Sequence, residues 1–81
     1  MKFAILGNGA WGTALGRVLL DNNHDVVLWG IEKELSDDIN NNHRLTRYFG
    51  NEVELPHNMH STTDLKEALD GAEAIVMTVP T

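Results

Sequence analysis

Residues 4–15 read AILGNGAWGTAL, and this stretch decides the fold. Three glycines, at positions 7, 9 and 12, follow an apolar run directly, and a helical pattern begins at Trp11. Glycine loses more conformational freedom on folding than any other residue, so three within six positions require a reason. We infer that some other group must approach this backbone so closely that side chains would obstruct it.

Around the glycines, short apolar runs alternate with helical patterns. The runs that predict strands are residues 2–6, 25–29, 59–62 and 73–79. Three segments predict helices: one that begins at residue 11 and ends within 21–23, one over 32–41, and one over 64–70. In the first helix the predicted buried face is Leu15, Val18 and Leu19. In the last helix we expect Thr63 as the N-cap and Gly71 just past the end. Residues 42–58 are expected to be irregular.

This alternation predicts an α/β fold, an incomplete Rossmann-type doubly wound parallel sheet with strand order 3-2-1-4. The last strand would be an apolar edge, which folded proteins avoid. The core of an 81-residue chain is also marginal. We therefore expect residues 1–81 to be the N-terminal part of a dinucleotide-binding domain, with the remainder of the protein, including a substrate domain, outside this chain.

The glycines match G-x-G-x-x-G, which is specific only between a strand and a helix, the context predicted here. Gly7 would permit the tight turn, Gly9 would let the backbone approach a pyrophosphate, and Gly12 would let the helix pack on the sheet. Trp11 would cap the pyrophosphate or wall the site, with packing on a neighbouring loop as the alternative. The predicted contacts in this loop are Gly7, Asn8, Gly9, Ala10, Trp11 and Gly12.

The second part of the fingerprint is an acid at the end of the second strand that binds the ribose hydroxyls. Glu32 follows Gly12 by 20 residues, two later than usual, and a solvated helix acid is the alternative interpretation. Ile31 would lie against the adenine, or would simply begin the helix. No arginine occurs at 30–32, and the nearest base is Lys33. The expected cofactor is NAD or NADP, with both accepted or NADH preferred.

Composition excludes several other classes of function. The net charge of −6 argues against nucleic acid as a partner. No apolar run approaches the ~18 residues of a membrane span, and the absence of cysteine favours the cytoplasm. His57 and His60 have a spacing seen in metal sites, but no third ligand is evident, so no metal is expected. The basic residues Arg44 and Arg47, beside Tyr48, are interpreted as offsetting nearby acids rather than reaching a phosphate.

Three stretches together resemble one enzyme family: AILGNGAWGTAL, HDVVLWG at 24–30 and TTDLKEALDGAEAIVMTVPT at 62–81. They are similar to the N-terminus of NAD(P)-dependent glycerol-3-phosphate dehydrogenase. The resemblance implies that the glycine loop, including Ala10 and Trp11, binds the pyrophosphate, and that Ile31 and Glu32 flank the adenosine ribose. Bacterial members often carry Arg or His at the position of Ile31, and often Tyr-Leu-Pro where this chain has residues 48–50.

The resemblance also implies a function for the longer protein. It would interconvert dihydroxyacetone phosphate and sn-glycerol 3-phosphate with NAD(P)H, for glycerophospholipid synthesis. The catalytic lysines would lie beyond residue 81, so the 81-residue chain alone is expected to be inactive. A homodimer is the assembly to test. Two alternatives stay open: another NAD(P)-dependent dehydrogenase, of 6-phosphogluconate or ketopantoate type, and a non-catalytic NAD-sensing regulatory module.

Overall fold

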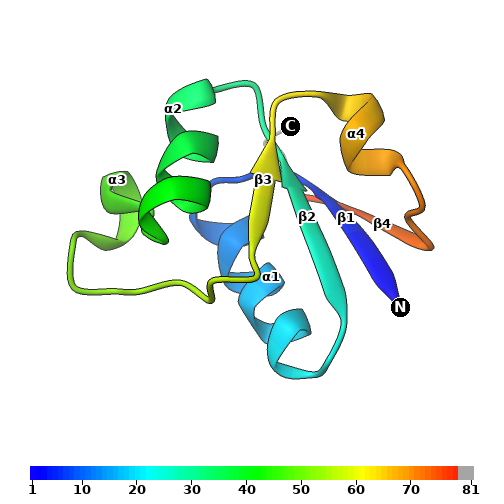
Figure 1. Cartoon of the computed structure of the whole chain (residues 1–81), viewed down its shortest axis with the longest axis horizontal. Helices are drawn as coiled ribbons and strands as arrows, with labels where there is room; N and C mark the ends of the chain where they lie inside the picture. The colour runs from blue at the N-terminus through cyan, green and yellow to red at the C-terminus, as the bar shows by residue number, and fades with distance from the viewer. Residues whose placement is uncertain (79–81) are drawn as a thin grey trace.

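The four apolar runs form one parallel sheet in the computed structural model, which describes residues 1–78 (Figure 1). The strand order is β3-β2-β1-β4, so the predicted order is confirmed. In the paired register Leu6 lies abreast of Trp29 on one side and of Met77 on the other. The strands are β1 (Lys2–Leu6), β2 (Asp25–Trp29), β3 (His60–Thr62) and β4 (Ala74–Met77). The predicted end of the last strand, residue 79, lies outside the described residues.

Five helical segments connect the strands. They are α1 (Ala10–Asp21), α2 (Lys33–Asp37), η1 (Asp38–Asn42), α3 (Thr46–Phe49) and α4 (Leu65–Leu69). The predicted helix over 32–41 is therefore an α-helical turn followed by the π-helical turn η1. This wider turn places Ile39 in the core, while the Asn40 side chain reaches β3.

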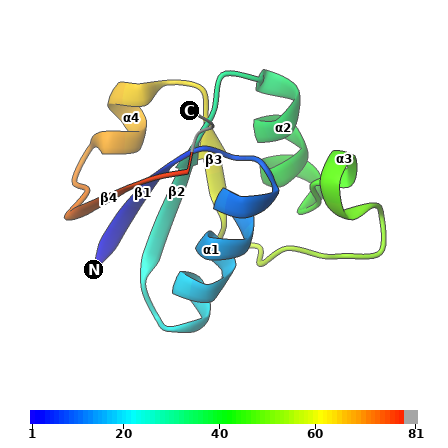
Figure 2. The same cartoon turned by 180° about the vertical axis from the view of Figure 1, so that it is seen from behind.

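The helices cover opposite faces of the sheet because successive strand residues point to opposite sides. Ile5, Val26 and Leu28 point toward α1, which lies behind the sheet in Figure 1 and in front of it in Figure 2. Leu35, Ile39, Leu45, Leu55 and Met59 from the connecting segment complete this core. On the other face, Val27 lines a hollow together with Glu67 of α4 and Asp70, the residue that follows this helix. Ile75 and Met77 of β4 are exposed.

The predicted apolar face of α1 is partly wrong. Val18 is 56% exposed, and the buried residues are Gly12, Thr13 and Gly16. A Cβ on Gly16 would lie 3.3 Å from side-chain carbons of Val26 and Leu28, so α1 approaches the sheet through its smallest residues. Such close packing turns Val18 away from the sheet, which a count of apolar spacing does not reveal.

Two local predictions also need correction. Residues 42–58 are not wholly irregular, because they contain α3. Asp38 Oδ2 accepts hydrogen bonds from Thr46 N (2.9 Å) and Oγ1 (3.0 Å), so the acid that fixes the start of α3 lies eight residues upstream. The N-cap of α4 is Asp64, not Thr63, because Asp64 Oδ1 accepts from the backbone N of Lys66 at 3.0 Å.

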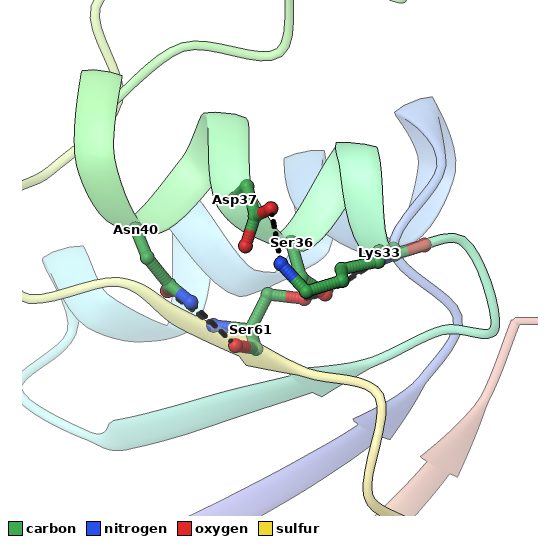
Figure 3. Close-up of polar contacts among 6 residues, drawn as sticks. Lys33, Ser36, Asp37, Asn40 and Ser61 are labelled. Atoms are coloured by element: carbon green, nitrogen blue, oxygen red, sulfur yellow. Dashed lines mark hydrogen bonds and ion pairs between the residues drawn. The ribbon is translucent and has the colours of Figure 1, made fainter.

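β3 forms one border of the sheet, and its outer edge is occupied. The carboxamide of Asn40 donates to Ser61 O at 2.7 Å and accepts from Ser61 N at 2.9 Å (Figure 3). The side chain therefore completes both backbone hydrogen bonds of Ser61 as a neighbouring strand would. Within residues 1–78, every helix is too short or too polar to cross a bilayer.

Candidate functional site

The turn between β1 and α1 is built on glycine. Gly7 has φ +145, which side-chain-bearing residues rarely adopt, and its N–H donates to Trp29 O at 2.7 Å. A Cβ on Gly12 would collide with the carbonyl of Gly7, so the first turn of α1 lies directly on this turn. The roles predicted for Gly7 and Gly12 thus correspond to the observed backbone.

The N-terminus of α1 is open to a ligand. Gly9 is the N-cap, and no side chain caps this end. Within the described chain, the N–H groups of residues 10–12 donate no hydrogen bond, and the first helical bond is Thr13 N to Gly9 O. Among the described residues, the atoms nearest to a Cβ on Gly9 would be those of the Tyr48 side chain, at 3.9 Å, an ordinary contact distance. Free donors at the positive end of a helix dipole, with no side chain above them, suit a phosphate.

A buried polar group holds the glycine loop in place. Asn8 is buried, and its Nδ2 donates to Ser36 Oγ (3.3 Å) and Ser61 Oγ (3.2 Å), while the two hydroxyls are 2.8 Å apart. Figure 3 shows Ser36 and Asn40 directed at Ser61. The loop after β1 is thereby tied to α2 and to β3. The sequence did not indicate this group, since its members are 28 and 25 residues apart.

All of the predicted site residues come together at the carboxyl end of the sheet. A cavity of about 680 Å³ lies there, a size ordinary for small-molecule sites. Its lining includes every predicted residue: Gly7, Asn8, Gly9, Ala10, Trp11, Gly12, Ile31 and Glu32. Sequence reasoning missed five more: Trp29, Gly30, Leu35, Tyr48 and Thr78. Of these only Tyr48 had a signal, as the aromatic residue beside Arg44 and Arg47.

Two large apolar side chains stand at the rim of this cavity. Trp11 is 78% exposed and Ile31 is 82% exposed, although both line the cavity. Most of the surface of each side chain is therefore free of protein contact. Exposed apolar side chains around a concave site are typical of ligand contact rather than of core packing.

Glu32, also at the rim, is paired with a base from a different segment. Arg47 Nη1 donates to Glu32 Oε2, and Arg47 Nη2 lies 3.7 Å from Glu34 Oε2. The hydrogen bond to Glu32 raises the pKa of Arg47. Lys33 instead pairs with Asp37 at 2.7 Å on the helix surface. Arg47 thus offsets nearby acids, as the sequence interpretation has it, and it does so at the cavity.

His57, one of the two histidines with metal-site spacing, contacts other side chains outside the cavity. His57 stacks on His43 with ring centroids 3.9 Å apart, and its Nε2 lies 3.3 Å from Glu54 Oε2. This hydrogen bond, with the nearby charge of Arg44, lowers the pKa of Glu54. Among residues 1–78 no group of three acidic, histidine or cysteine side chains is placed to hold a metal ion.

Comparison with known proteins places this geometry among dehydrogenases. The model of a family described as the N-terminus of NAD-dependent glycerol-3-phosphate dehydrogenase matches residues 2–81. Glycerol-3-phosphate dehydrogenase [NAD(P)+] of Streptococcus uberis is 54% identical over 80 residues, which cover 99% of this chain and 23% of the relative. The chain therefore spans less than a quarter of that relative.

Two solved structures are similar. The crystal structure of glycerol-3-phosphate dehydrogenase from Coxiella burnetii has a TM-score of 0.83 at 34% identity, over 94% of this chain and 23% of that one. The glycerol-3-phosphate dehydrogenase of Plasmodium falciparum has a TM-score of 0.82 at 35% identity, over 99% of this chain and 25% of that one. The sheet and its connections are thus shared by relatives of bacterial and eukaryotic origin.

Proposed function

The chain belongs to the family of NAD-dependent glycerol-3-phosphate dehydrogenase N-termini, and we propose that it is the cofactor-binding part of such an enzyme. The longer protein would interconvert dihydroxyacetone phosphate and sn-glycerol 3-phosphate with NAD or NADP as cofactor, for glycerophospholipid synthesis. Residues 1–81 would be the N-terminal part of its dinucleotide-binding domain. The substrate domain and the catalytic groups would lie outside this chain.

The observation that carries this proposal is the open N-terminus of α1 beneath a cavity lined by all of the predicted contacts. The free N–H groups of residues 10–12 would hold the pyrophosphate, at a point where Gly9 carries no side chain. Trp11 would wall the phosphates from solvent. Ile31 and Glu32, after β2, would flank the adenosine, with the Glu32 carboxylate accepting from the ribose hydroxyls.

In the proposed reaction, the cofactor supplies the chemistry and this chain positions the cofactor. The bound nicotinamide supplies the hydride. The residues of this chain bind and orient the dinucleotide, and they give its reactive end a fixed position at the carboxyl edge of the sheet. The groups that polarise the substrate carbonyl would belong to the rest of the longer protein, so the fragment alone would not catalyse the reaction.

The test is an assay of the full-length protein beside the fragment. Full-length protein should oxidise NADH in the presence of dihydroxyacetone phosphate, and NADH should quench the fluorescence of Trp11. Residues 1–81 alone should show no turnover. A full-length protein that neither binds NADH nor turns over would overturn the proposal. One that binds NADH without turnover on any phosphorylated ketose would favour a sensing module instead.

The proposal extends to the setting of the enzyme. Its small-molecule partner is the phosphorylated three-carbon substrate, its location the cytoplasm, and its assembly a homodimer. The cysteine-free composition supports the reducing compartment. Light scattering on the full-length protein would decide the assembly, since a monomer and a dimer differ twofold in mass.

A further inference from the structure

Arg47 lies against the one acidic residue that lines the cavity. Its guanidinium comes from α3 and donates to Glu32, which lies just after β2. The side chains of Arg47 and Glu32 are 44% and 50% exposed, so the pair is at the rim and within reach of solvent. The contact uses Glu32 Oε2 and leaves Oε1 available to accept another hydrogen bond.

The position of Arg47 is set by the fold and not by chance contact on a surface. Asp38 anchors the first residue of α3 through Thr46 N and Oγ1, at 2.9 and 3.0 Å. One residue after Arg47, Tyr48 lines the cavity beside Gly9. Arg47 thus lies between the residue anchored by Asp38 and a residue that lines the cavity, and its guanidinium reaches Glu32 at the rim.

We propose that Arg47 determines cofactor choice by acting as the counter-charge of Glu32, a proposal that rests on the function proposed above. NADP differs from NAD by a phosphate on the adenosine 2′-oxygen. A lone carboxylate beside this oxygen would accept from the ribose hydroxyls of NAD and would repel the 2′-phosphate. With Arg47 bound, the Glu32–Arg47 pair is neutral, Oε1 remains to accept from a ribose hydroxyl, and Glu32 no longer repels the 2′-phosphate as a lone carboxylate would.

The other nearby charges do not take this role. Ile31 carries no charge, and Lys33 is bound to Asp37 at 2.7 Å. Glu34, 90% exposed, adds a further negative charge 3.7 Å from Arg47 Nη2. Arg47 is therefore the cation, among residues 1–78, that offsets the Glu32 carboxylate at this rim. From the sequence, Lys33 is the base nearest to Glu32, and the expectation is that both cofactors are accepted or NADH is preferred.

The experiment measures binding of NADH and of NADPH by calorimetry, with the full-length protein and its variants. The wild type should bind the two within about tenfold of each other. Arg47→Gln should weaken the binding of NADPH relative to that of NADH by about tenfold, because the lone Glu32 carboxylate would then repel the 2′-phosphate at a partly exposed site. Arg47→Lys keeps the charge, so its ratio should stay close to that of the wild type. The effect of Arg47→Gln should shrink in high salt.

A double-mutant cycle isolates the counter-charge role. In a Glu32→Gln background, Arg47→Gln should change the ratio by less than about threefold, because no carboxylate remains to be neutralised. Arg44→Gln is the matched control: Arg44 lies in the same connecting segment, pairs with Glu54 at 3.6 Å, and should leave the ratio unchanged.

Several results would overturn the inference. The first is a ratio of NADPH to NADH affinity that Arg47→Gln leaves unchanged. The second is a ratio in Arg47→Lys equal to that in Arg47→Gln. The third is the same loss of NADPH affinity on Arg47→Gln with Glu32 and with Gln at position 32. The last would mean that Arg47 contacts the phosphate directly. If the wild type binds neither nucleotide, the proposed function itself fails, and that outcome is distinct from the other three.

Discussion

The carboxamide of Asn8 occupies the space in which a β-carbon on Gly30 would lie. Asn8 belongs to the glycine loop after β1, and Gly30 follows β2. Both residues line the cavity. The absence of a side chain at position 30 is therefore what allows Asn8 to turn inward and bind Ser36 and Ser61.

The first prediction concerns this pair. Asn8→Ala should lower the free energy of unfolding by about 1–3 kcal/mol, because it removes buried hydrogen bonds. Gly30→Ala should cost about as much by overpacking. In the Asn8→Ala background, however, Gly30→Ala should cost little, since its methyl group then has space. Urea unfolding of the four proteins measures this coupling, and strictly additive losses would contradict it.

Substitutions at two glycines of the fingerprint should have different effects, one on NADH binding and the other on stability. Gly9→Val should preserve the fold, since the nearest described neighbour of a Cβ there is Tyr48, at 3.9 Å. It should weaken NADH binding at least tenfold, or about 1.4 kcal/mol, because the side chain enters the space above the free N–H groups. Gly12→Ala should instead lower the melting temperature, because its methyl group collides with Gly7. Calorimetry and thermal unfolding on the full-length protein distinguish the two. Unchanged NADH affinity in Gly9→Val would disprove the phosphate role.

The start of α4 gives a third prediction. Asp64→Ala should destabilise the protein by about 1 kcal/mol, because Asp64 Oδ1 caps the N–H of Lys66. Thr63→Ala is the control. Thr63 accepts from Trp29 Nε1 through its backbone carbonyl, which alanine retains, so little change is expected. If thermal unfolding showed the same loss of stability in Asp64→Ala and Thr63→Ala, the assignment of Asp64 rather than Thr63 as the N-cap would be contradicted.

The fourth prediction is a pH dependence at Asp38. Partial burial raises the pKa of this carboxyl, but hydrogen bonds from the Thr46 backbone, Asn42 and the Thr46 hydroxyl outweigh it and lower the pKa. A carboxyl whose pKa falls on folding contributes stability above its unfolded pKa of about 3.9, and this is lost as pH falls through the folded value.

The stability difference between wild type and Asp38→Asn should therefore be present at neutral pH and should shrink below about pH 4. Melting temperatures across this range measure it. Asp37→Asn is the matched control, because the partner of Asp37 within residues 1–78 is the exposed Lys33, and such a pair should contribute little at any pH. A difference that is constant down to acid pH would contradict the role given to Asp38.

The fold could be predicted from local sequence patterns, and there is a physical reason for this. Strand, glycine turn and helix follow one another within residues 2–21, and the positive φ of Gly7 is of the kind that glycine adopts readily. The strand order follows from right-handed crossovers between parallel strands, which the alternation of elements already implies. The cavity lining predicted from the fingerprint also came together, because both of its parts lie at carboxyl ends of adjacent strands.

Partnerships between distant side chains were not predictable. Glu32 and Arg47 are 15 residues apart, and Asn8 and Ser61 are 53 apart. Nothing in the local pattern at either residue indicates the other. The exposure of Val18 has a similar origin, because the close approach of α1 depends on the space that Val26 and Leu28 leave to Gly16. The sequence thus indicated eight of the residues that line the cavity but not the contacts that hold them there.

The pairing of Asn40 with Ser61 gives the sheet a direction of growth. Because one carboxamide already takes up the outward-facing N–H and C=O of Ser61 in β3, an incoming strand could add there only by displacing it. β4 has no such side-chain cover among residues 1–78. Further strands, whether from the same polypeptide or from another copy, are therefore directed to β4, and accidental association through the opposite border is suppressed.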